Sequence, residues 1–352
     1  MTILLRQGDA SQEVADVQAR LRALGIGIDD ELGRFGTATT EAVRTFQQRR
    51  GVLVDGIVGP NTWSELVEAS WRLGDRALYL RHPLMRGDDV LTLQLRLNAL
   101  GFDAGREDGT FGPDTHRAVH AFQKEYDVPE DGIVGPITFE ALSGLRVERA
   151  DTAAGLREEI RLQDQPGIHQ ALIMIDPGHG ADDPGNIGPN LLREADVCWE
   201  LARLVAGRLI GAGARVRFTR TEVEAPDIRE RAARANDLGA QVFISIHLNA
   251  HDDEAACGAS TYYFRGSRSG RRLAESIQEF IVALGVGDCR SHPQSYASLK
   301  ETRMPAVIVE PCFITNSDEA MRLELPSFRA ALADAITGGI RAYFEHSMLV
   351  AS

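Results

Sequence analysis

The sequence predicts an α/β domain, built on a mainly parallel sheet with flanking helices and preceded by two small all-α three-helix modules. Two observations support this prediction. An internal repeat fills the first 145 residues, and short apolar runs alternate with helical segments from residue 171 onward. A chain of 352 residues is long enough for several separate cores. The expected boundaries are 1–72 for the first module, 73–145 for the second, 146–168 for a polar linker and 169–348 for the α/β domain.

The repeat is recognised from motifs that recur in one register. The stretch DGIVGP at 55–60 returns at 131–136, and the dipeptide FQ at 46–47 returns at 122–123. Both pairs are separated by 76 residues (55 to 131, and 46 to 122), so no insertion or deletion divides these parts of the copies. A shared register over several motifs indicates a duplication.

Each copy has the pattern of three short helices. Apolar residues between Val14 and Leu24 recur at the three- and four-residue spacing of one helical face, and Gly25 is placed to end that helix. The second copy repeats this arrangement from Val90 to Gly101. In both copies a second helix carries the FQ dipeptide, DGIVGP forms a turn, and a third helix follows the turn.

The C-terminal half has a different sequence pattern, in which apolar runs of strand length alternate with helical segments. This alternation is typical of an α/β domain around a mainly parallel sheet. Strands are expected at 171–175, 215–219, 241–246 and 306–309, and helices at 195–209, 228–239 and 270–284.

Polar residues follow the ends of three of these strands. They are His179 after the first strand, His247 after the third and Glu310 after the last, while Glu194 begins the next helix. The carboxyl ends of strands border the ligand crevice in open α/β sheets, so these side chains are expected to meet there. A single histidine in such a place is usually structural, and a glutamate at a helix start complements the helix dipole. The combination of the four residues is what points to chemistry.

The chemistry suited to this set is metal-assisted hydrolysis. Two neutral imidazoles and one carboxylate are a ligand set for catalytic zinc that leaves a position for water or substrate, so His179, Glu194 and His247 are predicted to bind Zn²⁺. Zinc would lower the pKa of water and polarise a carbonyl oxygen. Amide hydrolysis also requires a group that takes a proton from water and returns it to the leaving nitrogen, a role that fits Glu310.

Composition excludes some classes of partner. A net charge of −13 argues against a nucleic-acid binder and against electrostatic docking on an anionic membrane, and no apolar run has the length of a membrane span. The N-terminus reaches Arg6 without the apolar segment of a Sec signal, so the chain as written is expected to be cytoplasmic, or in the cell wall after release by a non-Sec route.

The four cysteines have no CxxC spacing and are expected to be free, buried thiols.

Residues 171–345 resemble the N-acetylmuramoyl-L-alanine amidase family 3. By position, the zinc ligands of that family correspond to His179, Glu194 and His247, and its catalytic glutamate to Glu310. The resemblance implies hydrolysis of the amide between the lactyl group of muramic acid and L-alanine, in peptidoglycan or muropeptides. The segments that carry it are IDPGHG at 175–180, RERAARAN at 229–236, FISIHLNA at 243–250 and MPAVIVEPCFITN at 304–316.

Two cysteines depart from the family pattern near the expected site. Cys198 stands where a polar residue is usual, and Pro311-Cys312 replaces the x-Gly that often follows the catalytic glutamate. Both thiols are therefore expected to lie close to the metal position, most simply as packing residues.

The two N-terminal copies resemble the peptidoglycan-binding domain type 1. The second copy has nearly the full motif, including Leu93-Gln94 and Asp108-Gly109, whereas the first has lost the DG dipeptide at 32–33. The resemblance implies a peptidoglycan ligand, with the second copy as the better candidate for binding it.

The whole architecture also resembles actinobacterial amidase-like cell-wall regulators, which leaves an alternative function open. Such a protein would act in the cytoplasm on wall-precursor synthesis, through a protein partner in cell-wall synthesis. Those regulators replace some zinc ligands, whereas this chain keeps all four site positions, which favours an active or at least zinc-binding protein. A phage endolysin is a second alternative.

Overall fold

The computed structural model describes residues 4–52, 54–145, 167–251 and 253–350. Contacts divide the chain into two compact units, Met1–Arg157 and Glu158–Ser352, which are described separately below. The predicted linker at 146–168 lies outside the described residues, apart from its last two positions. In the part of the chain that is described, no helix is long and apolar enough to cross a membrane.

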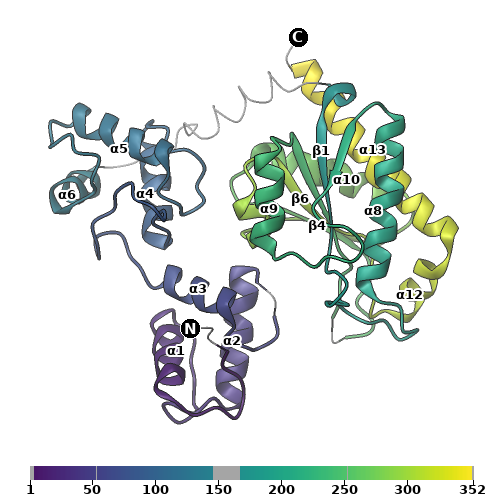
Figure 1. Ribbon diagram of the computed structural model, residues 1–352, viewed down its shortest axis with the longest axis horizontal. Helices are drawn as coiled ribbons and strands as arrows, with labels where there is room; N and C mark the ends of the chain where they lie inside the picture. Colours follow the sequence, from purple (N-terminus) through teal and green to yellow (C-terminus); the bar gives the residue numbers. More distant parts are fainter. Residues whose placement is uncertain (1–3, 53, 146–166, 252, 351–352) are drawn as a thin grey trace. The chain divides into compact units, whose positions relative to one another are not determined.

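The first unit consists of two three-helix modules, as the repeat predicts (Figure 1). Each module has its own apolar core, and the largest core side chains occupy equivalent positions, such as Phe46 and Phe122. The helices are α1 (Gln12–Ala23), α2 (Thr37–Arg50) and α3 (Pro60–Ala69) in the first module, and α4 (Asp88–Ala99), α5 (Pro113–Glu125) and α6 (Pro136–Gly144) in the second.

The glutamine of the repeated FQ motif fastens the DGIVGP turn to its helix. Gln47 is fully buried on α2; its Nε2 lies 2.7 Å from Asp55 Oδ1 and 2.9 Å from the Ile57 carbonyl oxygen, and its Oε1 accepts a 2.8 Å hydrogen bond from Gly56 N. Gln123 repeats these contacts in the second module at 2.8, 3.0 and 2.8 Å. The motif is therefore a structural clamp, because it satisfies polar groups of a turn that packs against the core.

The second unit is a three-layer α/β domain, which confirms the predicted fold class. Its six-stranded sheet has the order β2-β1-β3-β6-β4-β5, and every neighbouring pair is parallel except β4 with β6. The strands are β1 (Leu172–Pro177), β2 (Arg215–Phe218), β3 (Val242–Ile246), β4 (Ala259–Phe264), β5 (Asp288–Gln294) and β6 (Ala306–Glu310). The 3-10 helix η1 (Ile168–Gln170) precedes the sheet, and the helices are α8 (Glu194–Gly211), α9 (Ile228–Asp237), α10 (Arg268–Val282), α11 (Ala297–Glu301), α12 (Ser317–Glu324) and α13 (Pro326–Val350).

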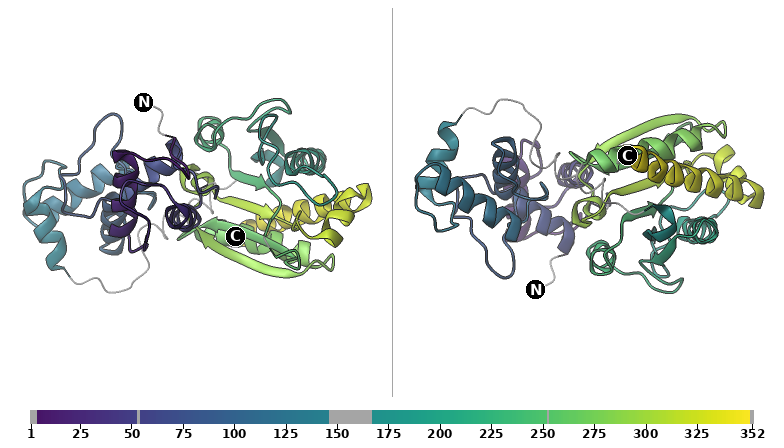
Figure 2. Two further views of the ribbon diagram at one scale, coloured as in Figure 1. Left: turned by 90° about the horizontal axis from the view of Figure 1, so that it is seen from below. Right: turned by 90° about the horizontal axis from the view of Figure 1, so that it is seen from above.

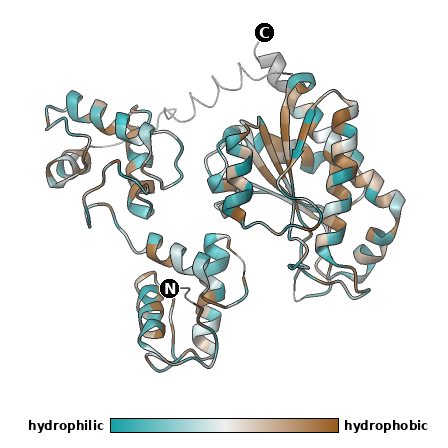
Figure 3. Ribbon diagram, in the orientation of Figure 1, coloured by the Kyte–Doolittle hydropathy of each residue, from teal (hydrophilic) through white to brown (hydrophobic). Residues whose placement is uncertain are grey.

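Helices cover both faces of this sheet (Figures 1 and 2). Alternate residues of β1 point to opposite layers: Ile173 and Ile175 belong to the core with α8, α10 and α13, whereas Leu172 and Met174 pack in the smaller core with α9 and α11. The central strands are accordingly among the most hydrophobic segments of the unit (Figure 3). A strand buried on both faces reads as a continuous apolar run, which is why β1, β3 and β6 were predictable.

The order of the strands places the polar residues that follow them. β1, β3 and β6 are parallel neighbours, so their carboxyl ends meet at one edge of the sheet. The strands β4 and β5 were not predicted. The sequence of β5, DCRSHPQ, is polar because this strand lies at the exposed edge of the sheet.

Replacement of the clamp glutamine is expected to destabilise its module. In Gln47→Met, the buried groups that Gln47 now satisfies lose their partner, at a cost of about 3 kcal/mol in unfolding free energy. Urea unfolding of the full chain, followed at the transition of the first module, measures this change. Gln48→Met, on the exposed neighbour, is the matched control and should leave the transition in place. Equal stability of the two variants would contradict a clamp role.

Candidate active site

The structure brings His179, Glu194 and His247 together at the carboxyl edge of the sheet. One potential ligand atom from each residue lies within 4.8 Å of the others. His179 Nε2 lies 3.0 Å from Glu194 Oε1, and His247 Nδ1 lies 3.1 Å from the same oxygen. Ligand atoms around a tetrahedral zinc ion, with bonds near 2.1 Å, are about 3.4 Å apart. The three residues thus fit a zinc site in donor type and spacing.

Glu194 is the most enclosed member of this cluster, with 1% of its side chain exposed. Its Oε2 accepts hydrogen bonds from the backbone N and the side-chain Nδ2 of Asn186, at 3.0 and 2.8 Å, and its Oε1 accepts one from Leu248 N at 3.0 Å. Burial by itself raises the pKa of Glu194, but hydrogen bonds from His179 and His247 outweigh it and hold the pKa well below the usual range. The carboxylate is therefore ionised, as a metal ligand must be.

His179 carries the positive charge that this carboxylate requires. Burial lowers the pKa of His179, but hydrogen bonds to Asp183 and Glu194 outweigh burial and raise it to about 9. In the metal-free protein, His179 is therefore protonated at neutral pH, and its positive charge lies between the carboxylates of Asp183 and Glu194. A bound divalent cation would compensate the charge of these carboxylates in the same way. The 2.8 Å contact of His179 Nδ1 with Asp183 Oδ2 also matches the carboxylate–histidine pairs that orient metal ligands.

Two arginines hold the turn that presents His179. Arg231 Nη1 donates to Asp176 Oδ1 at 3.0 Å and to the Pro177 carbonyl oxygen at 2.7 Å. Arg220 donates to the Pro177 and Gly178 carbonyl oxygens, both at 2.9 Å. The turn needs this support because His179 itself has a φ of 58°, a conformation that is costly for residues other than glycine.

Two glycines give the ligands room. A Cβ atom on Gly178 would lie 2.5 Å from Cε1 of His247, and one on Gly185 would lie 2.7 Å from Cδ2 of His179 and 2.8 Å from Cβ of Glu194. Carbon atoms in contact stay about 3.5–4.0 Å apart. Any other residue at these positions would displace a predicted ligand.

Glu310 ends β6, beside the strand that leads to His247. The two strand ends are joined by a 3.0 Å hydrogen bond from His247 N to the Val309 carbonyl oxygen. Burial raises the pKa of Glu310 to about 7; the charge of His247 and hydrogen bonds from Tyr262 and Ser260 offset only part of that effect. A carboxyl group that titrates near pH 7 is suited to accept and release protons.

Two tyrosines stand beside this carboxyl group. Tyr262 and Tyr296 have ring centroids 5.3 Å apart. Burial raises the pKa of Tyr296 to about 12, with a further contribution from Glu310, and both effects also hold the pKa of Tyr262 above its usual range. Both phenols stay protonated at neutral pH and are available as hydrogen-bond donors.

The four cysteines are free, but only two are buried as expected. Cys198 and Cys312 lie in the main core of the unit, and burial raises the pKa of both thiols. Cys198 also lies within the electrostatic influence of Glu194. The prediction of burial is wrong for Cys257, which is exposed just before β4, and Cys289 is partly exposed on the edge strand β5.

Several site residues had no signal in the sequence. Asp183 and Asn186 lie in the irregular stretch between β1 and α8, and Ser260 and Tyr262 lie on β4, which was not predicted. Their roles depend on loop conformation and on the antiparallel pairing that sets Ser260 opposite Glu310. Asp176 of the IDPGHG segment and Arg231 of the RERAARAN segment were visible as motif residues, but not as supports of the turn.

A family model described as N-acetylmuramoyl-L-alanine amidase matches residues 173–342, and one described as putative peptidoglycan binding domain matches residues 10–66 and 86–142. N-acetylmuramoyl-L-alanine amidase CwlM of Mycobacterium tuberculosis is 40% identical over 96% of this chain and 88% of its own length. N-acetylmuramoyl-L-alanine amidase LytC of Bacillus subtilis is 36% identical over 49% of this chain and 35% of its own length.

Solved structures match about half of the chain. N-acetylmuramoyl-L-alanine amidase AmiC2 of Nostoc punctiforme is 29% identical over 50% of this chain and 97% of its own, with a TM-score of 0.48. N-acetylmuramoyl-L-alanine amidase from Clostridium difficile 630 is 30% identical over 50% of this chain and 98% of its own, with a TM-score of 0.49.

Loss of space at Gly178 is expected to weaken metal binding. In Gly178→Ala, the new methyl group overlaps the His247 ring and pushes it away from the other donors. Calorimetric titration of the metal-free protein with Zn²⁺ should show an affinity at least tenfold lower than that of the wild type. Gly207→Ala, where an added Cβ meets nothing within 4 Å, is the control and should bind normally. Normal zinc binding by Gly178→Ala would show that the ring position is not critical.

The titration of Glu310 predicts a pH-dependent stability difference in the metal-free protein. An acid whose folded pKa lies above its unfolded value contributes stability at low pH, and this is lost as the pH rises through the folded pKa. The folded pKa of about 7 compares with an ordinary value of 4.5. The unfolding free energy of the wild type should therefore fall by roughly 2–3 kcal/mol relative to Glu310→Gln between pH 5 and pH 8.

Urea unfolding of both proteins at several pH values measures this difference. Glu324→Gln, at an exposed position on α12, is the matched control and should follow the wild type. A constant difference between wild type and Glu310→Gln over this range would mean that Glu310 ionises as an ordinary exposed carboxyl group.

Proposed function

The chain belongs to the N-acetylmuramoyl-L-alanine amidase family, and on that basis we propose that it uses Zn²⁺ to hydrolyse the amide bond between the lactyl group of muramic acid and L-alanine. The observation that carries the proposal is that the donor cluster of His179, Glu194 and His247 lies beside the carboxyl group of Glu310. His247 and Glu310 are found at the ends of the neighbouring strands β3 and β6. Peptidoglycan and its soluble muropeptides both contain this amide.

His179, Glu194 and His247 would hold the metal. When bound, Zn²⁺ lowers the pKa of water and polarises the carbonyl oxygen of the amide. The chain prepares the ligands for this role: Asp183 orients the His179 ring through Nδ1, and Asn186 fixes the Glu194 carboxylate. The ligands are thus positioned by contacts that exist before the substrate binds.

Glu310 would move the proton. As a base it accepts a proton from the attacking water, and as an acid it returns that proton to the nitrogen of the leaving L-alanine. In the metal-free protein, burial raises the pKa of this carboxyl group to about 7, well above that of an ordinary glutamate, which favours its use as a proton-transfer group. Hydrogen bonds from Tyr262 and Ser260 orient the carboxyl group, and Ser260 is itself held by Asn249 at 3.1 Å.

The two N-terminal modules would hold the enzyme on its polymer. Both match the putative peptidoglycan binding domain, and they precede the catalytic unit on the same chain. Tethering raises the effective concentration of the amide bonds near the catalytic unit without any new contact at the site. A regulator that worked only through protein partners would not need the complete ligand set or the tuned Glu310, so the site favours catalysis.

Digestion of purified muropeptides tests this function. The zinc-loaded protein should release a peptide with a free N-terminal L-alanine, identified by mass spectrometry. Glu310→Gln should lower kcat by roughly 10³-fold while still binding one zinc ion, because only proton transfer is lost. His179→Ala should lose the zinc ion together with activity.

Three results would oppose the proposal. Cleavage between sugars or within the peptide would assign another bond, and an active Glu310→Gln variant would assign proton transfer to another group. No hydrolysis by the zinc-loaded wild type would favour the regulatory alternative.

A further inference from the structure

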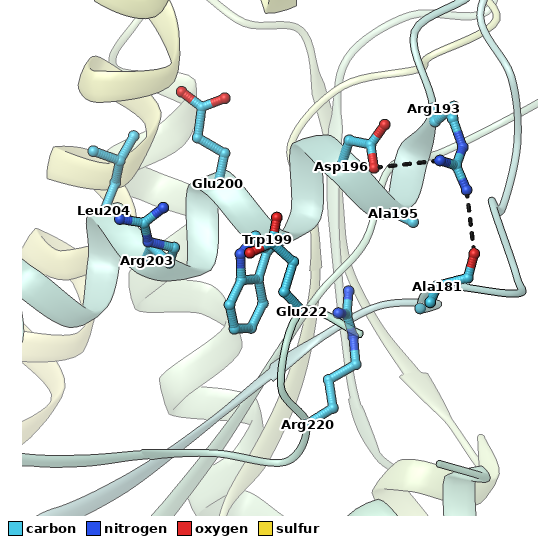
Figure 4. A pocket seen from close by; sticks show the side chains of 11 residues that line it. Ala181, Arg193, Ala195, Asp196, Trp199, Glu200, Arg203, Leu204, Arg220 and Glu222 are labelled. Atoms are coloured by element: carbon cyan, nitrogen blue, oxygen red, sulfur yellow. Dashed lines mark hydrogen bonds and ion pairs between the residues drawn. The ribbon is translucent and has the colours of Figure 1, made fainter. Parts of the chain in front are cut away.

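A polar pocket of about 700 Å³ is lined by residues next in sequence to two of the metal-binding candidates (Figure 4). Part of its wall is formed by residues 180–181, which directly follow His179, and another part by the first turns of α8, which begins at Glu194. The third part comes from residues 220 and 222, after β2. The segments that present two of the three metal-binding candidates thus also build the pocket, whose volume is typical of a ligand site.

The pocket offers guanidinium groups with donors to spare. Among the described residues, Arg203 forms no ion pair. Arg193 makes only long contacts, at 3.5 Å to the Ala181 carbonyl oxygen and 3.8 Å to Asp196 Oδ1. Arg220 differs, because it donates to backbone carbonyl oxygens of the turn that carries His179. Arg193 and Arg203 are therefore the groups available to an anionic ligand.

Carboxylates line the same pocket, which makes it amphoteric. Asp196 and Glu222 are both exposed in it, whereas Glu200 is engaged by Arg329 at 3.0 Å. Besides the engaged Arg220 and Glu200, the pocket thus offers two cationic and two anionic groups. This arrangement complements a ligand that carries both carboxylate and ammonium groups, and it disfavours a ligand with a single kind of charge.

The aromatic residue of the pocket favours a peptide over a sugar. Sugar rings stack on open aromatic faces, but the Trp199 ring already packs against Phe218 at 5.4 Å and lies beneath the Arg220 guanidinium at 5.3 Å. Trp199 thus serves as part of an apolar floor between charged groups. This combination suits the backbone and methyl groups of a short peptide.

We propose that this pocket binds the stem peptide on the leaving side of the amide, with Arg193 and Arg203 at its carboxylates and Asp196 and Glu222 at its free amino group. The inference rests on the proposed function, because it takes the amide at the metal centre as the start of that peptide. Gly180 and Ala181, which line the pocket, directly follow His179, and an extended peptide advances about 3.5 Å per residue, so a stem of a few residues has the length to reach from the metal centre to the pocket.

Direct binding of the product peptide tests the pocket without requiring catalysis. The free stem tripeptide, with L-alanine, a γ-linked D-glutamate and a diamino acid, is titrated calorimetrically into zinc-loaded Glu310→Gln protein. Adding Arg203→Gln should raise the Kd about tenfold, which corresponds to loss of one charge-assisted contact. Arg271→Gln, at an exposed position on α10 outside the pocket, is the control and should leave the Kd unchanged.

A chemical change in the peptide, combined with Arg203→Gln, gives a double-mutant cycle. A tripeptide with amidated carboxyl groups should bind about tenfold more weakly to the protein with Arg203 intact, and Arg203→Gln should weaken that peptide little further. Equal binding of both peptides, or binding that is insensitive to Arg203→Gln, would overturn the proposal.

Kinetic measurements distinguish failure of the pocket proposal from failure of the proposed amidase activity. In the active enzyme, Arg203→Gln should raise KM about tenfold for substrates with the full stem, with kcat unchanged and no effect on a substrate that ends at L-alanine. A protein that hydrolyses muropeptides but shows neither effect refutes the pocket alone. If the wild type hydrolyses nothing and yet binds the peptide through Arg203, the proposed catalysis fails while the pocket stands.

Discussion

The catalytic unit depends on one buried charge, the carboxylate of Glu194. Removing a carboxylate from water costs several kcal/mol unless hydrogen bonds and opposite charge replace the lost hydration. Here the compensation comes from three separate segments: the loop at Asn186, the turn at His179, and the residues His247 and Leu248 after β3. The contacts that compensate the buried charge of Glu194 therefore also hold the metal-binding candidates together. Stability and site geometry have a common origin in this unit.

A second constraint acts on the backbone beneath that cluster. His179 adopts a left-handed conformation, and the turn before it gives its carbonyl oxygens to two arginine side chains. Arg231 is in turn bound to Asp176, which is buried at the end of β1. Because the supports lie on regular elements or directly after them, the ligands are held before a substrate arrives. Such preorganisation is what allows fixed dipoles and charges to act on a transition state.

The parts of this arrangement that could be predicted are those that repeat a simple pattern. Apolar runs identified β1, β3 and β6, and the parallel order of an α/β sheet then implied that His179, His247 and Glu310 lie at one edge. The remaining contacts follow no period. Asp183 reaches His179 through an irregular loop, and Tyr262 reaches Glu310 from β4, whose antiparallel pairing with β6 leaves no periodic signature. Polar supports of this kind depend on tertiary pairing, which a single sequence does not display.

The duplicated modules show how far a motif can be taken as evidence of binding. Both copies keep the buried glutamine clamp and the glycine of the clamped turn, so selection for the fold alone explains these motif residues. The surface beside that glycine has diverged. A Cβ on Gly56 would meet Thr40 and Arg44, whereas one on Gly132 would meet His116 and His120. A threonine methyl group and a guanidinium contact different groups from two imidazoles. The modules therefore share a scaffold and present unlike chemistry beside the same turn, so any ligand that contacts this surface is expected to distinguish between them.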